Sequence, residues 1–165
     1  MDTPVESKKA PAFGEEQVAL LERLCRAVAV SGDEGEVRRI VLEEIRTHRP
    51  DAEIKVDALG NVLVICRGQG ENLPRVMVAA HMDEVGFMIS DDENEGIYRF
   101  EIVGGIDERH LVGKPVLVGR EHIPGVIGAK PIHLTKADER RSNVSLDSLR
   151  IDIGPSSGKK VEIGE

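Results

Sequence analysis

Residues 76–90 read VMVAAHMDEVGFMIS, a short aliphatic run that leads directly into His81 and Asp83. An unbroken run of this length is typical of a strand that is buried on both faces of a sheet. In α/β sheets, ligands bind at the carboxyl ends of the strands. We therefore predict that residues 76–80 form a buried strand and that His81 lies at a ligand-binding end of it.

His81 and Asp83 are the candidate site residues. Imidazole is the commonest nitrogen ligand for zinc and similar metals. Residues two apart on an extended backbone point to the same face, so Asp83 can accept a hydrogen bond from the His81 ring nitrogen that does not face the metal and thereby orient the ring. Two alternatives stay open: Asp83 binds the metal itself, or His81 merely ends the strand, with Asp83 and Glu84 as solvated turn residues.

The residues before this strand predict two helices and a hairpin. Apolar residues recur at helical spacing in residues 15–30 and again in residues 37–45. A capping box of Ser31 with Glu34, or of Asp33 with Glu36, can start the second helix, which Pro50 ends. Residues 52–66 then alternate as two strands joined by a turn near residues 59–61.

The residues after Asp83 predict mostly β-structure. Short strand-like runs cover residues 85–90, 97–103, 114–119, 123–129 and 148–154, with Gly, Pro and Asp between them. Closely spaced strands of this kind favour a small barrel or sandwich. The whole chain is therefore expected to be an α/β protein with a β-rich second part.

Charge and composition exclude several classes of function. The net charge is -8, with no long basic run, which argues against binding to nucleic acid or to an anionic membrane surface. No apolar run approaches the roughly 18 residues of a membrane helix, and the N-terminus lacks the apolar centre of a signal peptide. We expect a cytoplasmic protein in which Cys25 and Cys66 are reduced core residues.

Four motifs in order carry a resemblance to a known family. They are AAHMDEVGFM (79–88), VGGIDERHLVGKPVLVG (103–119), IPGVIGAKPIHL (123–134) and LRIDIGPSS (149–157). From about Glu15 to its end, the chain resembles the tetrahedral aminopeptidases, also called deblocking or glutamyl aminopeptidases, some of which have been labelled endoglucanases. The resemblance implies an α/β/α zinc-peptidase-like catalytic domain that is interrupted by a small β-barrel dimerisation domain.

The resemblance also implies boundaries and a site. Residues 1–14 are expected to be a flexible tail, residues 15–90 the N-terminal half of the catalytic domain, and residues 91–165 an incomplete β-rich dimerisation domain. In such enzymes the histidine of the first motif, here His81, binds one of two divalent metal ions, zinc or cobalt. The aspartate two residues later, here Asp83, orients that histidine.

The remaining metal ligands and the general base of the family follow the inserted domain, and no residue of this chain matches them. The resemblance therefore implies an N-terminal part of a metal-dependent aminopeptidase that hydrolyses N-terminal residues from short peptides and forms homo-oligomers. It also implies that the 165-residue chain alone is inactive and exposes the strand at residues 76–80. The alternative is a naturally truncated, non-catalytic assembly module of a full-length relative. A glycoside hydrolase would need two opposed carboxylates, and no such pair is evident.

Overall fold

The computed structural model describes residues 13–135, 144–155 and 161–164. Most of the predicted flexible tail of residues 1–14 lies outside these ranges. The contacts divide the chain into two compact units: Met1–Ala29 with Asp33–Met82, and Val30–Gly32 with Asp83–Glu165. Among the described residues, no helix has the length and apolar character that crossing a membrane requires.

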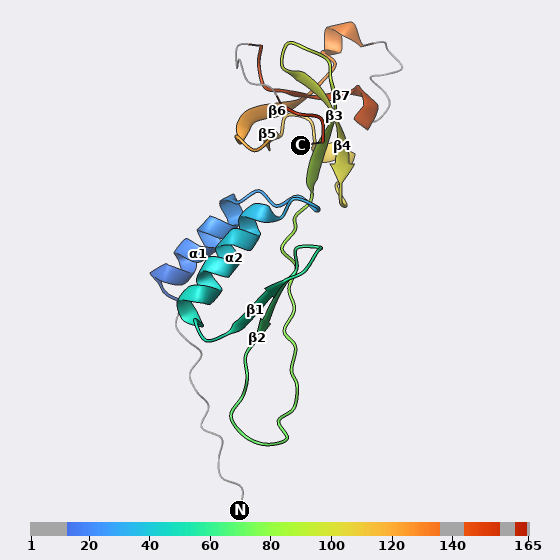
Figure 1. Cartoon of the computed structure of the whole chain (residues 1–165). Helices are drawn as coiled ribbons and strands as arrows, with labels where there is room; N and C mark the ends of the chain where they lie inside the picture. Colours follow the sequence, from blue (N-terminus) through green and yellow to red (C-terminus); the bar gives the residue numbers. More distant parts are fainter. Residues whose placement is uncertain (1–12, 136–143, 156–160, 165) are drawn as a thin grey trace, which may run out of the picture. The chain divides into compact units, whose positions relative to one another are not determined.

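The first unit contains the two predicted helices, α1 (Glu15–Arg26) and α2 (Gly35–His48), which lie side by side in Figure 1. The backbone N–H of Gly14 donates to Gln17 Oε1 at 2.9 Å and satisfies one of the donors at the start of α1. Arg23 of α1 donates to the carboxylates of Glu43 and Glu44 on α2, so ion pairs join the two helices.

The predicted capping boxes at the start of α2 are wrong. Glu34 is the N-cap residue and makes no side-chain capping bond there. The hydroxyl of Ser31 donates to Asp83 instead, and the carboxylate of Glu36 accepts the backbone N–H of Val28 at 3.1 Å. Both side chains are therefore used for longer-range contacts, which compete with local capping.

Strands β1 (Glu53–Val56) and β2 (Val62–Ile65) form the predicted antiparallel hairpin. Asp57 organises the turn, because its Oδ1 accepts the backbone N–H groups of Leu59 at 3.0 Å and Asn61 at 2.9 Å. Gly60 has a φ of 86°, a conformation that side-chain-bearing residues rarely adopt. Arg38 Nη1 donates to the Gly60 carbonyl at 3.3 Å and ties α2 to this turn.

The prediction of a buried strand at residues 76–80 is wrong. These residues lie outside every strand of the described part of the chain, and the side chains of Val76, Met77 and Val78 are 83%, 88% and 93% exposed. Burial on both faces needs paired strands on both edges and covering layers, and the described residues of the first unit supply only the β1–β2 hairpin as a sheet. The side chains are exposed, as the resemblance implies, but these residues do not form the exposed strand that was expected.

The apolar side of the first unit is largely uncovered. None of the residues of α1 is buried, and Val37 is the buried residue of α2. Cys25 and Cys66, predicted as core residues, are free and exposed. The helix predicted from the apolar periodicity is present as α1, but its apolar residues Val18 and Leu21 are each more than half exposed.

The second unit is built on an antiparallel sheet whose described strands have the order β3-β4-β7-β6-β5. Their bounds are β3 Gly86–Asp92, β4 Ile97–Val103, β5 Pro115–Val118, β6 Ile123–Ala129 and β7 Leu149–Asp152. The described connections also include the 3-10 turns η1 (Glu108–His110), η2 (Ile132–Leu134) and η4 (Leu146–Ser148). The chain is therefore an α/β protein, as predicted, whereas the β-barrel remains a prediction.

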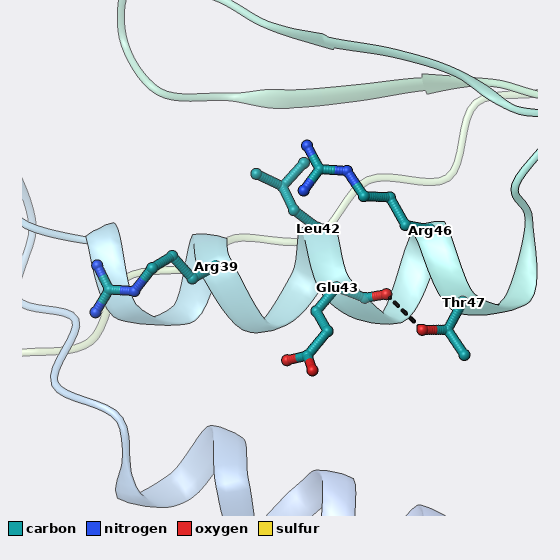
Figure 2. A pocket seen from close by; sticks show the side chains of 5 residues that line it. All are labelled: Arg39, Leu42, Glu43, Arg46 and Thr47. Atoms are coloured by element: carbon teal, nitrogen blue, oxygen red, sulfur yellow. Dashed lines mark hydrogen bonds between the residues drawn. The ribbon is translucent and has the colours of Figure 1, made fainter.

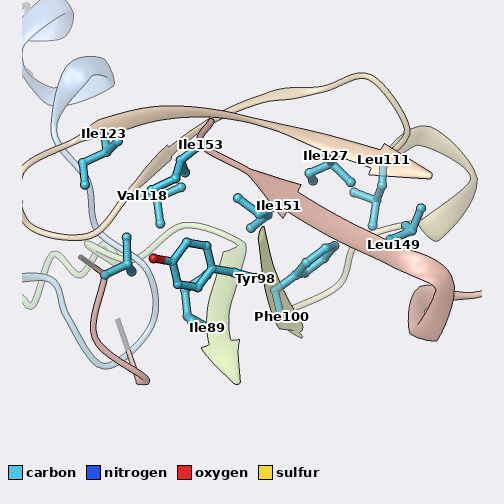
Figure 3. Close-up of a cluster of buried hydrophobic side chains, with 11 residues drawn as sticks. Ile89, Tyr98, Phe100, Leu111, Val118, Ile123, Ile127, Leu149, Ile151 and Ile153 are labelled. Atoms are coloured by element: carbon cyan, nitrogen blue, oxygen red, sulfur yellow. The ribbon is translucent and has the colours of Figure 1, made fainter. Parts of the chain in front are cut away.

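The core of the second unit lies on one side of this sheet (Figure 3). It is mainly aliphatic, and its three most completely buried side chains are Ile127, Leu149 and Ile151. The ring of Phe100 meets that of Phe87 edge to face, with 5.1 Å between the centroids. Tyr98, the only tyrosine of the chain, is also buried here.

After the short segment Val30–Gly32, the chain passes to the second unit again between Met82 and Asp83, whereas the predicted domain boundary lies between residues 90 and 91. That boundary falls inside β3, which pairs with β4 from Gly86↔Val103 onward. Strand pairing thus assigns residues 86–90 to the β-rich unit. The aliphatic character of VGFMIS suits either unit, and the boundary of the catalytic domain remains a prediction.

Candidate functional site

Asp83 is the first residue of the long segment of the second unit and is half-buried. Its Oδ2 accepts a hydrogen bond from the hydroxyl of Ser31 at 2.6 Å, across 52 residues of sequence. Hydrogen bonds to an ionised carboxylate are shorter and stronger than neutral ones. Asp83 is therefore held by a specific partner, in contrast to the alternative in which it is only a solvated turn residue.

The loop that carries Ser31 is fixed to the strand segment after Asp83. Val30 forms an isolated parallel bridge with Glu84. A Cβ atom added at Gly86 would lie 2.5 Å from Cγ2 of Val30, so only glycine allows this approach of the two segments. Ser31 was predicted only as a possible helix cap. Its partner lies too far along the sequence for local patterns to indicate the contact.

His81 belongs to the first unit and is exposed, in the segment that follows residues 76–80. His81 and Asp83 each interact with at least one other group of the protein. The other four histidines lie elsewhere: His48 is in the last turn of α2, His110 and His133 are in 3-10 turns, and His122 is in the turn before β6. None of these four carries a motif that points to metal binding.

A two-metal centre needs more ligands than these residues supply. A catalytic zinc usually has three protein ligands, and within residues 13–135, 144–155 and 161–164 no group of three or more His, Cys, Asp or Glu side chains could hold a metal ion. His81 has the chemistry of one ligand, and Asp83 that of its orienting acceptor or of a ligand. The described residues thus fit a part of such a centre and cannot form it alone.

A hollow on the surface of α2 offers no alternative site. Figure 2 shows its lining residues, which all come from that helix: Arg39, Leu42, Glu43, Arg46 and Thr47. The Thr47 hydroxyl donates to the Glu43 carbonyl at 2.9 Å, and the Glu43 carboxylate pairs with Arg23. Because its carboxylate and hydroxyl already have these partners, the hollow lacks convergent groups for catalysis.

A charged cluster on the second unit is structural. Glu93 accepts hydrogen bonds from Nε of Arg150 and Nε of Arg99, each at 2.7 Å. These bonds, that from Arg150 first, lower the pKa of Glu93 from 4.5 to about 2. Arg150 lies on β7 and Arg99 on β4, so the cluster joins two neighbouring strands.

Comparisons with known proteins identify the family. The family model of the M42 glutamyl aminopeptidases matches residues 60–164. A putative aminopeptidase of Acetivibrio thermocellus is 37% identical over 155 residues, which are 92% of this chain and 44% of that protein. The putative aminopeptidase FrvX of Escherichia coli is 39% identical over 150 residues, which are 88% of this chain and 40% of that protein.

Solved structures agree with these sequence comparisons. The crystal structure of a TET aminopeptidase from a marine sediment archaeon of the Thaumarchaeota aligns with a TM-score of 0.81 at 34% identity, over 91% of this chain and 43% of that one. The TET1 peptidase of Pyrococcus horikoshii, which can assemble into a tetrahedron or a large octahedral shell, aligns with a TM-score of 0.65 at 35% identity, over 88% of this chain and 44% of that one.

The chain spans about two fifths of the length of these relatives. The matched residues include His81, Asp83 and all strands of the second unit. The motifs noted in the sequence, the matching family model and the shared fold agree with one another, and this chain belongs to the M42 glutamyl aminopeptidase family.

Proposed function

We propose that this chain is the N-terminal part of a metal-dependent aminopeptidase that removes N-terminal residues from short peptides. The family match over residues 60–164, which contains the AAHMD motif, carries the proposal. The relatives that it matches over most of its length are named aminopeptidases. In this proposal the complete protein is a cytoplasmic hydrolase.

His81 is proposed to bind one of two divalent metal ions, zinc or cobalt, through one ring nitrogen. Asp83 is proposed to accept a hydrogen bond from the other ring nitrogen, which keeps the imidazole in the tautomer that a metal requires. When bound, a pair of metal ions activates a water molecule and polarises the scissile carbonyl. The further ligands and the general base are proposed to come from residues that this chain does not contain.

The exposed apolar residues of the first unit support this proposal. Val18 and Leu21 on α1, and Val76, Met77 and Val78, are each more than half exposed. Burying such side chains contributes about 1.5–3 kcal/mol each, so an uncovered set of them is unfavourable for an isolated domain. An additional layer from the rest of a catalytic domain would cover them, as the greater length of the relatives suggests.

The second unit is proposed to be a small β-barrel inserted in the catalytic domain and to mediate homo-oligomer formation. The related Pyrococcus horikoshii peptidase assembles into closed shells. Exposed apolar side chains on the second unit, Leu117 and Val126 among them, give a second copy a surface on which to pack.

The test measures peptidase activity in the product of the native gene, expressed in full and supplied with Zn²⁺ or Co²⁺. We expect release of chromophore from aminoacyl chromogenic substrates, loss of that activity in His81→Ala, and little change in His48→Ala. His48 is a matched control because it is an exposed histidine that pairs with Glu44 on α2. Absence of turnover in the unmodified full-length product would overturn the proposal.

The 165-residue chain alone, with the same metals, is expected to show no turnover. Turnover by this chain would mean that its own residues complete the site, against the ligand count given above. The alternative, a non-catalytic assembly module, predicts instead that the native gene ends after Glu165 and that the product co-purifies with a full-length relative.

A further inference from the structure

We infer that Ser31 is a positioning residue that fixes the carboxylate of Asp83 and, through it, the tautomer of His81. The inference rests on the proposed role of Asp83 as the hydrogen-bond acceptor for His81. It assigns a role to a residue outside the AAHMD motif, in the loop between α1 and α2.

The hydrogen bond between Ser31 and Asp83 has the geometry of a strong contact. The donor and acceptor oxygens are 2.6 Å apart, within the range expected for a hydroxyl that donates to a carboxylate. The terminal torsion of an aspartate is broad and weakly restrained by its own rotamers. A donor on Oδ2 therefore sets the plane of the carboxylate and, with it, the direction of the second oxygen.

The backbone around Ser31 supports this position on both sides. Before it, Val30 is bridged to Glu84, the residue that follows Asp83, and packs against Gly86. After it, Gly32 has a φ of 99°, which lets the chain turn away immediately. Donor and acceptor are thus carried by two segments that are themselves paired, so the contact does not depend on an unsupported loop.

The chemistry of a carboxylate allows both contacts at once. An ionised aspartate has about four acceptor positions on two oxygens. A bond from Ser31 on Oδ2 is therefore compatible with a bond from an imidazole N–H to the same carboxylate. A carboxylate with a fixed plane favours the tautomer of His81 that carries its proton on the nitrogen facing Asp83, whereas a rotating carboxylate discriminates less.

The test measures the tautomer ratio of His81 by long-range proton–nitrogen NMR correlation of the imidazole ring in the metal-free 165-residue chain. The spectra are recorded in mildly alkaline buffer, and all variants are compared at the same pH. We expect a preference of about tenfold for one tautomer, as a hydrogen bond to a charged group provides. No enzymatic activity enters this measurement.

Four variants separate the roles. Asp83→Asn removes the charged acceptor and should abolish the preference. Ser31→Ala should reduce the preference by about threefold or more, and Ser31→Thr, which keeps the hydroxyl, should restore it. Ser148→Ala is the matched control, because the Ser148 hydroxyl donates to the Ser145 carbonyl in the same unit and does not contact Asp83.

The outcomes distinguish this inference from the proposed function. If Asp83→Asn changes the ratio and Ser31→Ala does not, the role of Ser31 is overturned while that of Asp83 stands. If neither variant changes the ratio, both roles fall. A change in Ser148→Ala as large as that in Ser31→Ala would also overturn the inference, because a general perturbation would then explain it.

Discussion

The contact between Gly86 and Val30 predicts a specific energetic coupling. In Gly86→Ala the new Cβ atom would lie 2.5 Å from Cγ2 and 3.4 Å from Cγ1 of Val30, but 3.5 Å from its Cβ. The first distance is far inside van der Waals contact, whereas the last is ordinary. Overpacking of this kind costs about 1–3 kcal/mol. Truncating Val30 to alanine removes both of the crowded methyl groups.

The magnitudes of the single changes set the expectation for the pair. Val30 is half-buried, so Val30→Ala should cost about 0.8 kcal/mol, half of the value for two fully buried methyl groups. Independent effects would then sum to about 2–4 kcal/mol. Because the clash disappears in the double variant, we expect a total loss of only about 1 kcal/mol and a coupling of about 1–3 kcal/mol.

The assay is urea unfolding followed by tyrosine fluorescence. Tyr98 is the only tyrosine, the chain has no tryptophan, and the side chain is 3% exposed in the core of the second unit. The signal therefore reports the unit that contains Val30 and Gly86. Gly105→Ala is the matched control, since nothing lies within 4 Å of a Cβ at that position, and it should change stability by less than about 0.5 kcal/mol. Additive single effects would refute the reasoning.

Three other changes test the core, the charged cluster and the hairpin. Ile127→Ala, at a side chain that is 0% exposed, should cost about 2–5 kcal/mol in the same unfolding assay. Glu93 has a folded-state pKa of about 2, below its ordinary 4.5. Its contribution to the free energy of unfolding is therefore present above about pH 4.5 and is lost as the pH falls towards 2. On acidification across that range, Glu93→Gln should lose less stability than the parent. Asp57→Ala removes the hydrogen-bond acceptor of the hairpin turn, so amide hydrogen exchange in β1 and β2 should become faster. Asp51→Ala is the control, because the Asp51 carboxylate pairs with Arg49 in the described contacts. Equal exchange rates in the two variants would contradict this prediction.

Local patterns predicted the elements whose stability is local. The runs at residues 97–103 and 123–129 coincide with β4 and β6, because alternation along a half-buried strand depends only on having one core face. The hairpin at residues 52–66 also followed from its turn residues. By contrast, residues 76–80 have the composition of a central strand, and a central strand exists only when its neighbours are present on both sides.

The candidate site shows the same limit. The sequence indicated His81 and Asp83 as candidates because a histidine and an aspartate directly follow one apolar run. It did not indicate Ser31, whose contact with Asp83 spans 52 residues, because a serine before an acidic residue is also a common helix-capping pattern. Only the pairing of Val30 with Glu84 brings that serine to the carboxylate.

The assignment of Val30–Gly32 to the second unit has a consequence for the connectivity of the chain. Residues 33–82 form an insertion between the two segments of the second unit, Val30–Gly32 and the segment that begins at Asp83. This insertion carries α2, the hairpin and His81. Closing a loop of about 50 residues costs roughly 3.5 kcal/mol of chain entropy before constant terms. The bridge between Val30 and Glu84 and the hydrogen bond between Ser31 and Asp83 close that loop, and His81 lies two residues before Asp83. A shortened protein that begins at residue 83 would lose the Val30–Glu84 bridge and the Ser31–Asp83 hydrogen bond. Joining Val30–Gly32 to the β-rich unit through a short linker would retain both contacts.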